Sequence, residues 1–375
     1  MTTRQRLVEI LEHKGALLPE WAAAVAGVDR ALFVPDTYQY RESLIVKKDS
    51  PEKWARYVYG DTPLITQVND GKSVEGGYEL PTSSTSMPSL MLQMLGLLEV
   101  RKGHHVLEVG TGTGYNAGWL THRLGDRLVT SIEMDEGVAA EARKNLRRAG
   151  LAPRLILGDG LSGVKAHAPF DRLISTCCVQ EIPGAWVEQT PEGRIVTPWG
   201  NGYFSASFAV LDVSRGVATG RFSGYPAFMW ARQQRPGYGY LVDYLHHENE
   251  GTKSRTTVNP ESVRNDTDAR FAVAVQVSGL WSMLCTADDG SDESTLWLLA
   301  DDRRSWASLD YVPGETSFEV DQYGPRRLWD EVRIAYSWWS EHGRPERDAF
   351  GLTVTETGGQ QVWLRTPEVP VPTVR

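Results

Sequence analysis

Residues 106–114, Val-Leu-Glu-Val-Gly-Thr-Gly-Thr-Gly, join an apolar run to three glycines at alternate positions. The pattern predicts a β-strand that enters a tight turn, because glycine lets the backbone turn sharply and approach a ligand closely. A second apolar run, 128–132, ends at Glu133, about twenty residues further on. A carboxylate there can accept hydrogen bonds from both hydroxyls of a ribose. The spacing therefore predicts a site for a nucleoside cofactor.

The glycine spacing leaves the class of nucleoside open. A dinucleotide fingerprint needs a small residue five positions after its first glycine. Counted from Gly110 that position holds Tyr115, which is too large, and counted from Gly112 it holds Ala117, which is acceptable. Glu108 before the alternate glycines is instead similar to the S-adenosylmethionine (SAM) site of class I methyltransferases. We expect SAM as the cofactor, with a nicotinamide or flavin nucleotide as the alternative. The residues expected to bind it are Glu108, Gly110, Gly112, Gly114, Glu133, Met134, Asp159 and Gly160.

Apolar runs and helical periodicity alternate across the middle of the chain. The predicted strands are 106–109, 128–133, 155–157, 172–176 and 194–196, and the helices between them include 115–124 and 136–149. This alternation predicts an α/β fold with an open, mainly parallel, Rossmann-like sheet and helices on both faces. Ligands of such sheets bind beyond the carboxyl ends of the strands, where Glu108, Glu133, Asp159 and Cys177 would meet. Asp159 could accept a hydrogen bond from an adenine amino group, or only form the turn that Asp-Gly favours.

The flanking regions have other patterns. Residues 1–85 are predicted to form a helical, substrate-covering segment, and a helix should begin at Ser86, whose hydroxyl can act as the N-cap ahead of Pro88. After Pro198, residues 203–213 and 217–232 alternate as antiparallel strands do. Beyond Pro236 we expect an α+β domain, with strands near 270–276, 295–300, 351–356 and 361–364 and a helix near 327–341. The predicted domains are 1–85, 86–236 and 237–375.

Composition narrows the classes of function. The chain has 375 residues, a formal net charge of −9 and no basic block, which argues against a nucleic-acid partner. No apolar run is long enough to cross a membrane and no N-terminal signal segment is evident, so we expect a cytoplasmic protein. Three cysteines, two of them adjacent, do not suggest a disulfide framework. His246, His247 and Glu248 are neighbours whose side chains diverge, so we expect solvated surface and no metal site.

Several short segments together resemble one family. They are 28–35 (VDRALFVP), 59–64 (YGDTPL), 84–88 (STSMP), 105–117, 158–160 (GDG), 168–172 (APFDR) and 181–183 (EIP). In combination they resemble signatures of the protein-L-isoaspartate O-methyltransferases, which implies a class I, SAM-dependent enzyme that methylates a carboxylate. Two departures fall in the segment that would cover the substrate. The stretch between Pro63 and Ser86 is longer than in that family, and Ser84 and Met87 stand where the family has Thr and Gln.

The C-terminal region resembles a narrower group. Segments 324–331 and 350–354 are similar to the C-terminal domain of homologues found with ribosomally made peptide natural products (RiPPs), namely lanthipeptides, graspetides and lasso peptides. This resemblance implies methylation of an aspartate side chain in a modified precursor peptide, and closure of the ester to an aspartimide that can hydrolyse to isoaspartate. The alternatives are repair of isoaspartate in damaged proteins and a SAM-binding subunit without activity. The Trp-rich C-terminal domain could line a peptide groove, although tryptophan is more often core.

The expected chemistry needs few groups. A carboxylate is ionised at cytosolic pH, so it can accept a methyl group without a general base. It must be placed in line with the methyl group and freed of water. The resemblance identifies Ser86 as the residue that orients it, as a hydroxyl donor at the start of a helix whose N–H groups also favour an anion. The residues expected to contact the substrate are Asp61, Ser84, Thr85 and Glu181.

Overall fold

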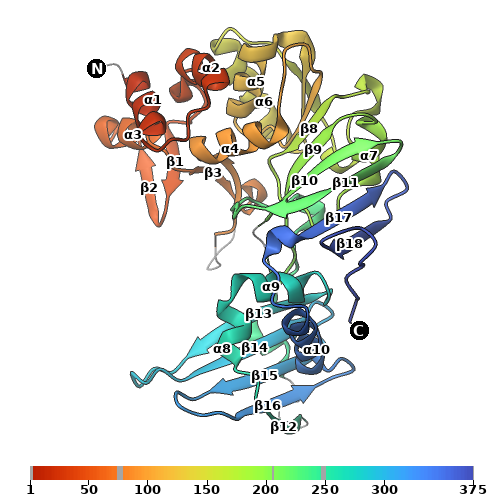
Figure 1. The fold of residues 1–375 in the computed structure, drawn as a ribbon. Coiled ribbons are helices and arrows are strands. Elements are labelled where there is room, and N and C mark those ends of the chain that lie inside the picture. The colour runs from red at the N-terminus through yellow and green to blue at the C-terminus, as the bar shows by residue number, and fades with distance from the viewer. Residues whose placement is uncertain (1–2, 74–78, 205–206, 246–250, 375) are drawn as a thin grey trace.

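The computed structural model describes residues 3–73, 79–204, 207–245 and 251–374. Within these ranges the chain forms three β-sheets, of four, nine and five strands (Figure 1). In Figure 1 the small N-terminal sheet lies to the left of the nine-stranded sheet, and the five-stranded sheet of a second domain lies below them. This arrangement agrees with the predicted α/β fold followed by an α+β region.

The N-terminal segment combines short helices with an antiparallel sheet. Its helical elements are α1 (Thr3–His13), η1 (Pro19–Trp21), α2 (Ala22–Gly27), η2 (Arg30–Leu32) and α3 (Pro51–Val58). Its strands are β1 (Thr37–Tyr40), β2 (Ser43–Val46), β3 (Leu64–Val68) and β4 (Pro81–Thr85), in the order β2-β1-β3-β4. Buried Tyr38, Trp54 and Leu64 help to pack α3 against this sheet. The segment is therefore only partly helical, because a four-stranded antiparallel sheet accounts for much of residues 37–85.

The central sheet is built on five parallel strands. They are β5 (Val106–Val109), β6 (Val129–Glu133), β7 (Arg154–Leu157), β8 (Arg172–Ser175) and β9 (Arg194–Trp199), in the order β7-β6-β5-β8-β9. The chain first moves to one side of β5 and then crosses to the other. The carboxyl end of β5 is therefore the switch point at which such sheets bind ligands. The predicted parallel sheet is confirmed.

Helices cover both faces of these strands, because successive strand residues point to opposite sides. On one face Val106 and Val129 pack with α4 (Pro88–Leu98) and α5 (Tyr115–Leu124). On the other face Leu107 packs in the cluster that contains Trp186 of α7 (Gly184–Gln189). Helix α6 (Glu136–Arg148) connects β6 to β7 and belongs to the first face, because its Leu146 packs in the same cluster as Val106 and Val129. These helices hold the strand ends, and the loops that follow them, in fixed positions.

Four antiparallel strands extend the central sheet. They are β10 (Ser207–Ser214), β11 (Val217–Ser223), β17 (Phe350–Thr355) and β18 (Gln360–Leu364). The first two are the predicted antiparallel pair, and both are shorter than predicted. The last two come from the end of the chain, and Figure 1 shows them in blue beside the green β11. The predicted domain of residues 237–375 therefore is not one unit, because residues 350–364 pair with β11 in the central sheet.

The second domain is inserted between β11 and β17. Its strands are β12 (Thr252–Thr256), β13 (Leu280–Thr286), β14 (Ser294–Ala300), β15 (Trp306–Tyr311) and β16 (Phe318–Tyr323), in the order β12-β16-β15-β14-β13. Its helices are α8 (Pro260–Asn265), α9 (Thr267–Ala274) and α10 (Leu328–Glu341). The predicted strand near 270–276 is wrong, because α9 occupies that region. A short continuous apolar run fits a buried helix as well as a buried strand.

Candidate active site

A cavity of about 630 Å³ lies at the carboxyl ends of β5, β6 and β8. Its walls are the loops after these strands, residues of β3 and β4, and residues 227–235, which follow β11. The predicted site residues that line it are Ser84, Ser86, Glu108, Gly110, Gly112, Glu133, Met134, Asp159 and Gly160. The predicted residues outside its lining are Asp61, Thr85, Gly114 and Glu181. The cofactor set and part of the substrate set therefore meet at the predicted sheet edge.

The glycine turn after β5 keeps the cavity open. Gly110 and Gly112 have φ angles of 87° and 54°, in the left-handed region that glycine tolerates best. A Cβ at Gly110 would lie 2.6 Å from Cys177 Sγ, so a larger residue would push into the cavity wall. Gly114 also has a φ of 87°, and a Cβ there would lie 3.3 Å from the side chain of Leu146 on α6. This third glycine therefore allows helix packing rather than contact with a ligand.

Glu133 ends β6 with its carboxylate held by backbone amides. Its Oε2 accepts a hydrogen bond from Gly112 N–H at 3.0 Å, and its Oε1 accepts from Met134 and Asp135 N–H at 3.0 and 3.1 Å. Burial raises the pKa of Glu133 against the lowering effect of these bonds. A carboxylate has about four acceptor positions, so three bonds leave room for a ribose hydroxyl to donate. The side chain is thus oriented toward the cavity before a ligand arrives.

Glu108 is a fully buried carboxylate in the cavity wall. Its Oε1 accepts from Asn116 Nδ2 at 2.7 Å and its Oε2 from Ser131 Oγ at 2.5 Å. Burial raises its pKa to about 7, because the charged form loses its hydration. A cationic ligand would favour the charged form. The residues present therefore fit SAM. Its sulfonium and ammonium groups are cations that Glu108 can face, and its ribose hydroxyls can donate to Glu133. The glycines of the turn leave room for its amino-acid chain.

Asp159 follows β7 and lies at the cavity rim. Its Oδ1 accepts from Leu161 N–H at 2.9 Å, so it is the N-cap of the short 3-10 helix η5 (Gly160–Ser162). The turn-forming role considered for Asp159 is thus present, and the contact with an adenine amino group stays a prediction.

Cys177 lines the same cavity, and burial raises the pKa of its thiol to about 12, which keeps it protonated.

Ser86 lines the cavity but does not cap α4. The helix runs from Pro88 to Leu98, and its N-cap is Met87, which makes no side-chain cap bond. Asp61 takes the capping role instead, because its Oδ1 accepts from Ser89 N–H at 2.8 Å. The predicted cap was wrong because a residue distant in sequence reaches this helix end. The Ser86 hydroxyl is therefore not committed to the helix.

A buried arginine fixes the backbone around Ser86. Arg30 is 1% exposed, and its guanidinium donates hydrogen bonds to five carbonyl oxygens, those of Val58, Gly60, Thr62, Thr85 and Ser86. Burial lowers its pKa to about 10. Sequence reasoning did not assign this role, although Arg30 lies in the 28–35 segment used for the resemblance. The signal was an arginine within a mainly apolar motif, which a buried polar network can explain.

The remaining substrate-contact predictions lie outside the cavity. Asp61 has a side chain that is 1% exposed, and its Oδ2 forms an ion pair with Lys14 at 2.7 Å. Thr85 is buried and donates to Thr113 Oγ1 at 3.1 Å. Glu181 is exposed, and its backbone N–H donates to Gln234 Oε1 at 2.9 Å. These residues support the walls of the site, whereas Ser84 and Ser86 face into it.

The described part of the chain holds no group of three or more His, Cys, Asp or Glu side chains that could bind a metal. The His246–Glu248 stretch lies outside the described residues. No helix of the described ranges is long and apolar enough to cross a membrane.

The parallel sheet, its switch-point cavity and the carboxylate-and-glycine lining define a class I SAM-dependent methyltransferase. Comparison with known proteins identifies the family. Residues 2–214 match the model of the protein-L-isoaspartate(D-aspartate) O-methyltransferase family. A protein-L-isoaspartate O-methyltransferase of Hyperthermus butylicus is 31% identical over 230 residues, which are 58% of this chain and 83% of that protein. The chain belongs to this family and is a SAM-dependent carboxyl methyltransferase.

Two further comparisons extend this result. Protein-L-isoaspartate O-methyltransferase 2 of Archaeoglobus fulgidus is 33% identical over 201 residues, or 53% of this chain and 78% of that protein. A solved structure of a protein-L-isoaspartate O-methyltransferase has a TM-score of 0.56 at 21% identity, and the match covers 97% of this chain and 100% of that chain. At this identity the match concerns the fold alone. The match includes the region after residue 214, which the family model does not cover.

Proposed function

We propose that this protein transfers a methyl group from SAM to the free α-carboxylate of L-isoaspartyl residues in peptides and proteins. The observation that carries the proposal is that Ser86 and the cofactor residues line one cavity in a chain of the isoaspartate methyltransferase family. The relatives found by comparison are named for this substrate. It was the alternative to a ribosomal-peptide substrate in our interpretation of the sequence, and these names favour it.

The transfer needs placement rather than proton removal. SAM supplies an electrophilic methyl carbon. A carboxylate oxygen forms a bond to that carbon while the carbon–sulfur bond breaks and its electron pair stays on sulfur. The carboxylate is already ionised, so no base takes part. Ser86 would donate its hydroxyl to the second carboxylate oxygen and hold the first in line with the methyl group. Arg30 supports this geometry, because it fixes the carbonyl oxygens of Thr85 and Ser86.

The start of α4 contributes less to anion binding than its position suggests. The N–H group of Ser89 is already used by Asp61, so one of the N–H groups at this helix end is taken by the protein's own carboxylate. Once the ester has formed, the backbone nitrogen of the next residue can attack it and release methanol, which closes a five-membered imide. This step is intramolecular and fast without help from a protein. Hydrolysis of the imide then yields aspartyl or isoaspartyl peptide.

The ribosomal-peptide interpretation rested on two C-terminal segments. One of them, 350–354, lies in β17 of the central sheet and extends it next to β11. The tryptophans that could line a peptide groove are Trp281, Trp297, Trp306, Trp329, Trp338, Trp339 and Trp363. Five of the seven are buried, and only Trp297 and Trp338 are not. These side chains form core rather than a free surface, so they do not support a groove.

Matched peptides test the substrate. A linear peptide with L-isoaspartate, the same peptide with L-aspartate, and an aspartate-containing crosslinked peptide are incubated with methyl-labelled SAM, and base-labile methyl ester is measured. We expect efficient methylation of the isoaspartyl peptide and poor methylation of the other two. A preference for the crosslinked aspartyl peptide would contradict the proposal and favour the ribosomal-peptide interpretation.

Ser86 is tested on the same peptide. The substitution Ser86→Ala should lower kcat by about tenfold or more, because it removes one hydrogen-bond donor at the reacting carboxylate. The dissociation constant for SAM should stay within twofold. The matched control is Ser43→Ala, which makes the same change at an exposed position of β2. If Ser86→Ala methylates at the control rate, Ser86 has no part in orienting the substrate.

A further inference from the structure

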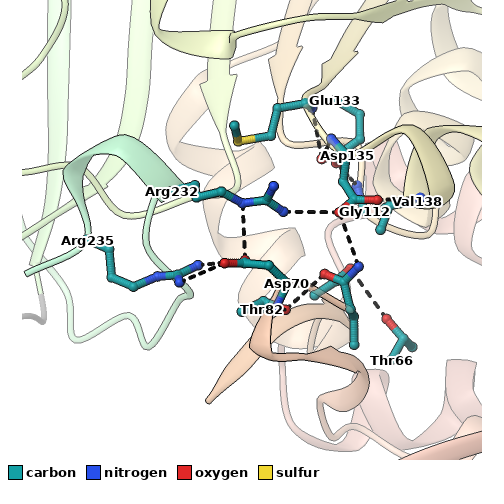
Figure 2. A network of polar contacts seen from close by, with 12 residues as sticks. Thr66, Asp70, Thr82, Gly112, Glu133, Asp135, Val138, Arg232 and Arg235 are labelled. Carbon is teal, nitrogen blue, oxygen red and sulfur yellow. Dashed lines mark hydrogen bonds and ion pairs between the residues drawn. The ribbon is translucent and has the colours of Figure 1, made fainter. Parts of the chain in front are cut away.

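Two arginines enter the cavity wall from a part of the chain beyond the family match. Of the described residues that line the cavity, Arg232 and Arg235 are the cations, and both follow β11, outside residues 2–214. Figure 2 shows them reaching toward two carboxylates, Asp70 and Asp135. We call these four residues the arginine clasp. Its members come from three segments that are far apart in sequence.

The clasp is a continuous set of ion pairs. Arg235 holds Asp70 with two hydrogen bonds, from Nη1 to Oδ2 at 3.1 Å and from Nη2 to Oδ1 at 3.0 Å. Arg232 joins the two acids, because its Nε lies 3.1 Å from Asp70 Oδ1 and its Nη2 lies 3.1 Å from Asp135 Oδ2. Two-point contacts between arginine and carboxylate are among the stronger and more directional ion pairs. The result is a bridge across the cavity rim.

Each end of the bridge is anchored on a different wall. Asp70 lies in η3 (Asn69–Gly71), just after β3, and its own N–H donates to Thr82 Oγ1 of β4 at 3.1 Å. Asp135 lies two residues after Glu133 and caps α6, because its Oδ1 accepts from Val138 N–H at 3.1 Å. Gln67 of β3 donates a hydrogen bond from its Nε2 to the same carboxylate at 3.3 Å. The clasp thus ties the β3-β4 wall and the segment after β11 to the end of β6.

The clasp lies at the nucleoside end of the cavity. Asp135 is two residues after Glu133, whose carboxylate is placed for a ribose, so a bound nucleoside would sit beneath these ion pairs. The side chains are only partly shielded, with 18% exposure for Asp70, 34% for Arg232 and 22% for Arg235. Ion pairs that are partly open to solvent can break and re-form, and salt weakens them. Asp70 also has a φ of 54°, in the left-handed region that aspartate enters more readily than most non-glycine residues.

We propose that the arginine clasp closes the nucleoside end of the cofactor cavity and that its opening limits release of the demethylated cofactor. Arg232 and Arg235 are then positioning residues that the segment before the inserted domain supplies to the cofactor site. The proposal concerns cofactor exchange and does not depend on which carboxylate accepts the methyl group.

The test uses the full chain with Asp70→Asn, which keeps the shape of the side chain and removes its charge. Release of S-adenosylhomocysteine from the preformed complex is followed by stopped-flow tryptophan fluorescence. We expect release to be about tenfold faster in Asp70→Asn, because a two-point ion pair is lost. Arg255→Gln is the control. Arg255 lies at an exposed position of β12 and also contacts two acids, Glu315 and Glu319, which are far in sequence from the cavity residues. This substitution should leave release unchanged.

Two further measurements distinguish ion pairs that open during cofactor release from ion pairs that only stabilise the fold. Release from the unchanged protein should become faster as KCl rises, while release from Asp70→Asn should respond less to salt. In the ligand-free proteins, amide hydrogen exchange of residues 64–70 and 227–235 should be faster in Asp70→Asn than in the control. Equal release rates and equal exchange in the two variants would overturn the proposal, and so would an equal salt response of the variant and the unchanged protein.

Discussion

Glu108→Gln is the substitution for which the structure gives opposite consequences for stability and for cofactor binding. Glu108 is fully buried and is charged only at the cost of its hydration, so its pKa rises from 4.5 to about 7. The amide can keep both observed contacts. Its oxygen can accept from Asn116, and its NH₂ can donate to Ser131 Oγ, which can then donate to Thr111 Oγ1, 2.6 Å away.

The pKa shift sets the size and the pH range of the effect on stability. The pKa of Glu108 is higher in the folded than in the unfolded protein, so the folded protein is favoured when Glu108 is protonated. This contribution to the free energy of unfolding is fully present below pH 4.5 and is lost as pH rises to about 7. A shift of this size corresponds to a loss of roughly 3 kcal/mol in the free energy of unfolding. The Gln variant has no such loss. Its stability relative to the unchanged protein should therefore increase by roughly 2 kcal/mol between pH 5.5 and pH 8.

The assay is urea unfolding of the ligand-free proteins across this pH range, followed by tryptophan fluorescence. Glu141→Gln is the control, because it makes the same change at an exposed residue paired with Lys144. The SAM dissociation constant at pH 8 should increase by about tenfold or more in Glu108→Gln, since a cationic ligand loses a charged partner. A stability difference that does not change with pH, or unchanged SAM affinity, would refute the roles given to burial and charge at Glu108.

Three other substitutions test the supports of the site. Arg30→Met should lower the free energy of unfolding by roughly 3 to 5 kcal/mol in urea titrations, because buried carbonyls lose their donor, and a loss below about 1 kcal/mol would contradict this. Asp61→Ala should cost about 1 kcal/mol as a lost helix cap and leave KM for the peptide unchanged, so a large rise in KM would restore Asp61 as a substrate residue. Glu133→Ala should raise the SAM dissociation constant about tenfold or more by isothermal titration, and an unchanged constant would rule out its ribose role.

The parts of the fold that depend on neighbouring residues could be predicted from the sequence. The apolar run into the glycine turn, the acidic residue at the end of β6 and the alternation of strands and helices identify the parallel sheet and the edge where its ligand binds. Glu108, Gly110, Gly112 and Glu133 line the cavity as predicted. Each of these signals is local, because strand and turn propensities act over a few residues.

Features that depend on distant pairing were missed. The sequence of β17 is a plain strand pattern, and nothing in it indicates that its partner is β11 rather than a strand of the inserted domain. The cap of α4 is Asp61, from a segment 28 residues earlier, so the nearby Ser86 was chosen instead. The roles of Arg30 and the arginine clasp depend on carbonyls and carboxylates that only the folded chain brings together. Charged residues carry no periodic signal that would reveal such contacts.

The most direct measurement of the central claim is a single turnover with methyl-labelled SAM and a peptide that contains both one L-isoaspartate and one L-aspartate. Fragment masses from the product then show which carboxylate carries the label. The account predicts label on the isoaspartyl α-carboxylate with the unchanged protein and with Ser43→Ala, and at least tenfold slower labelling with Ser86→Ala. Label on the aspartyl side chain, or equal labelling by Ser86→Ala, would contradict it.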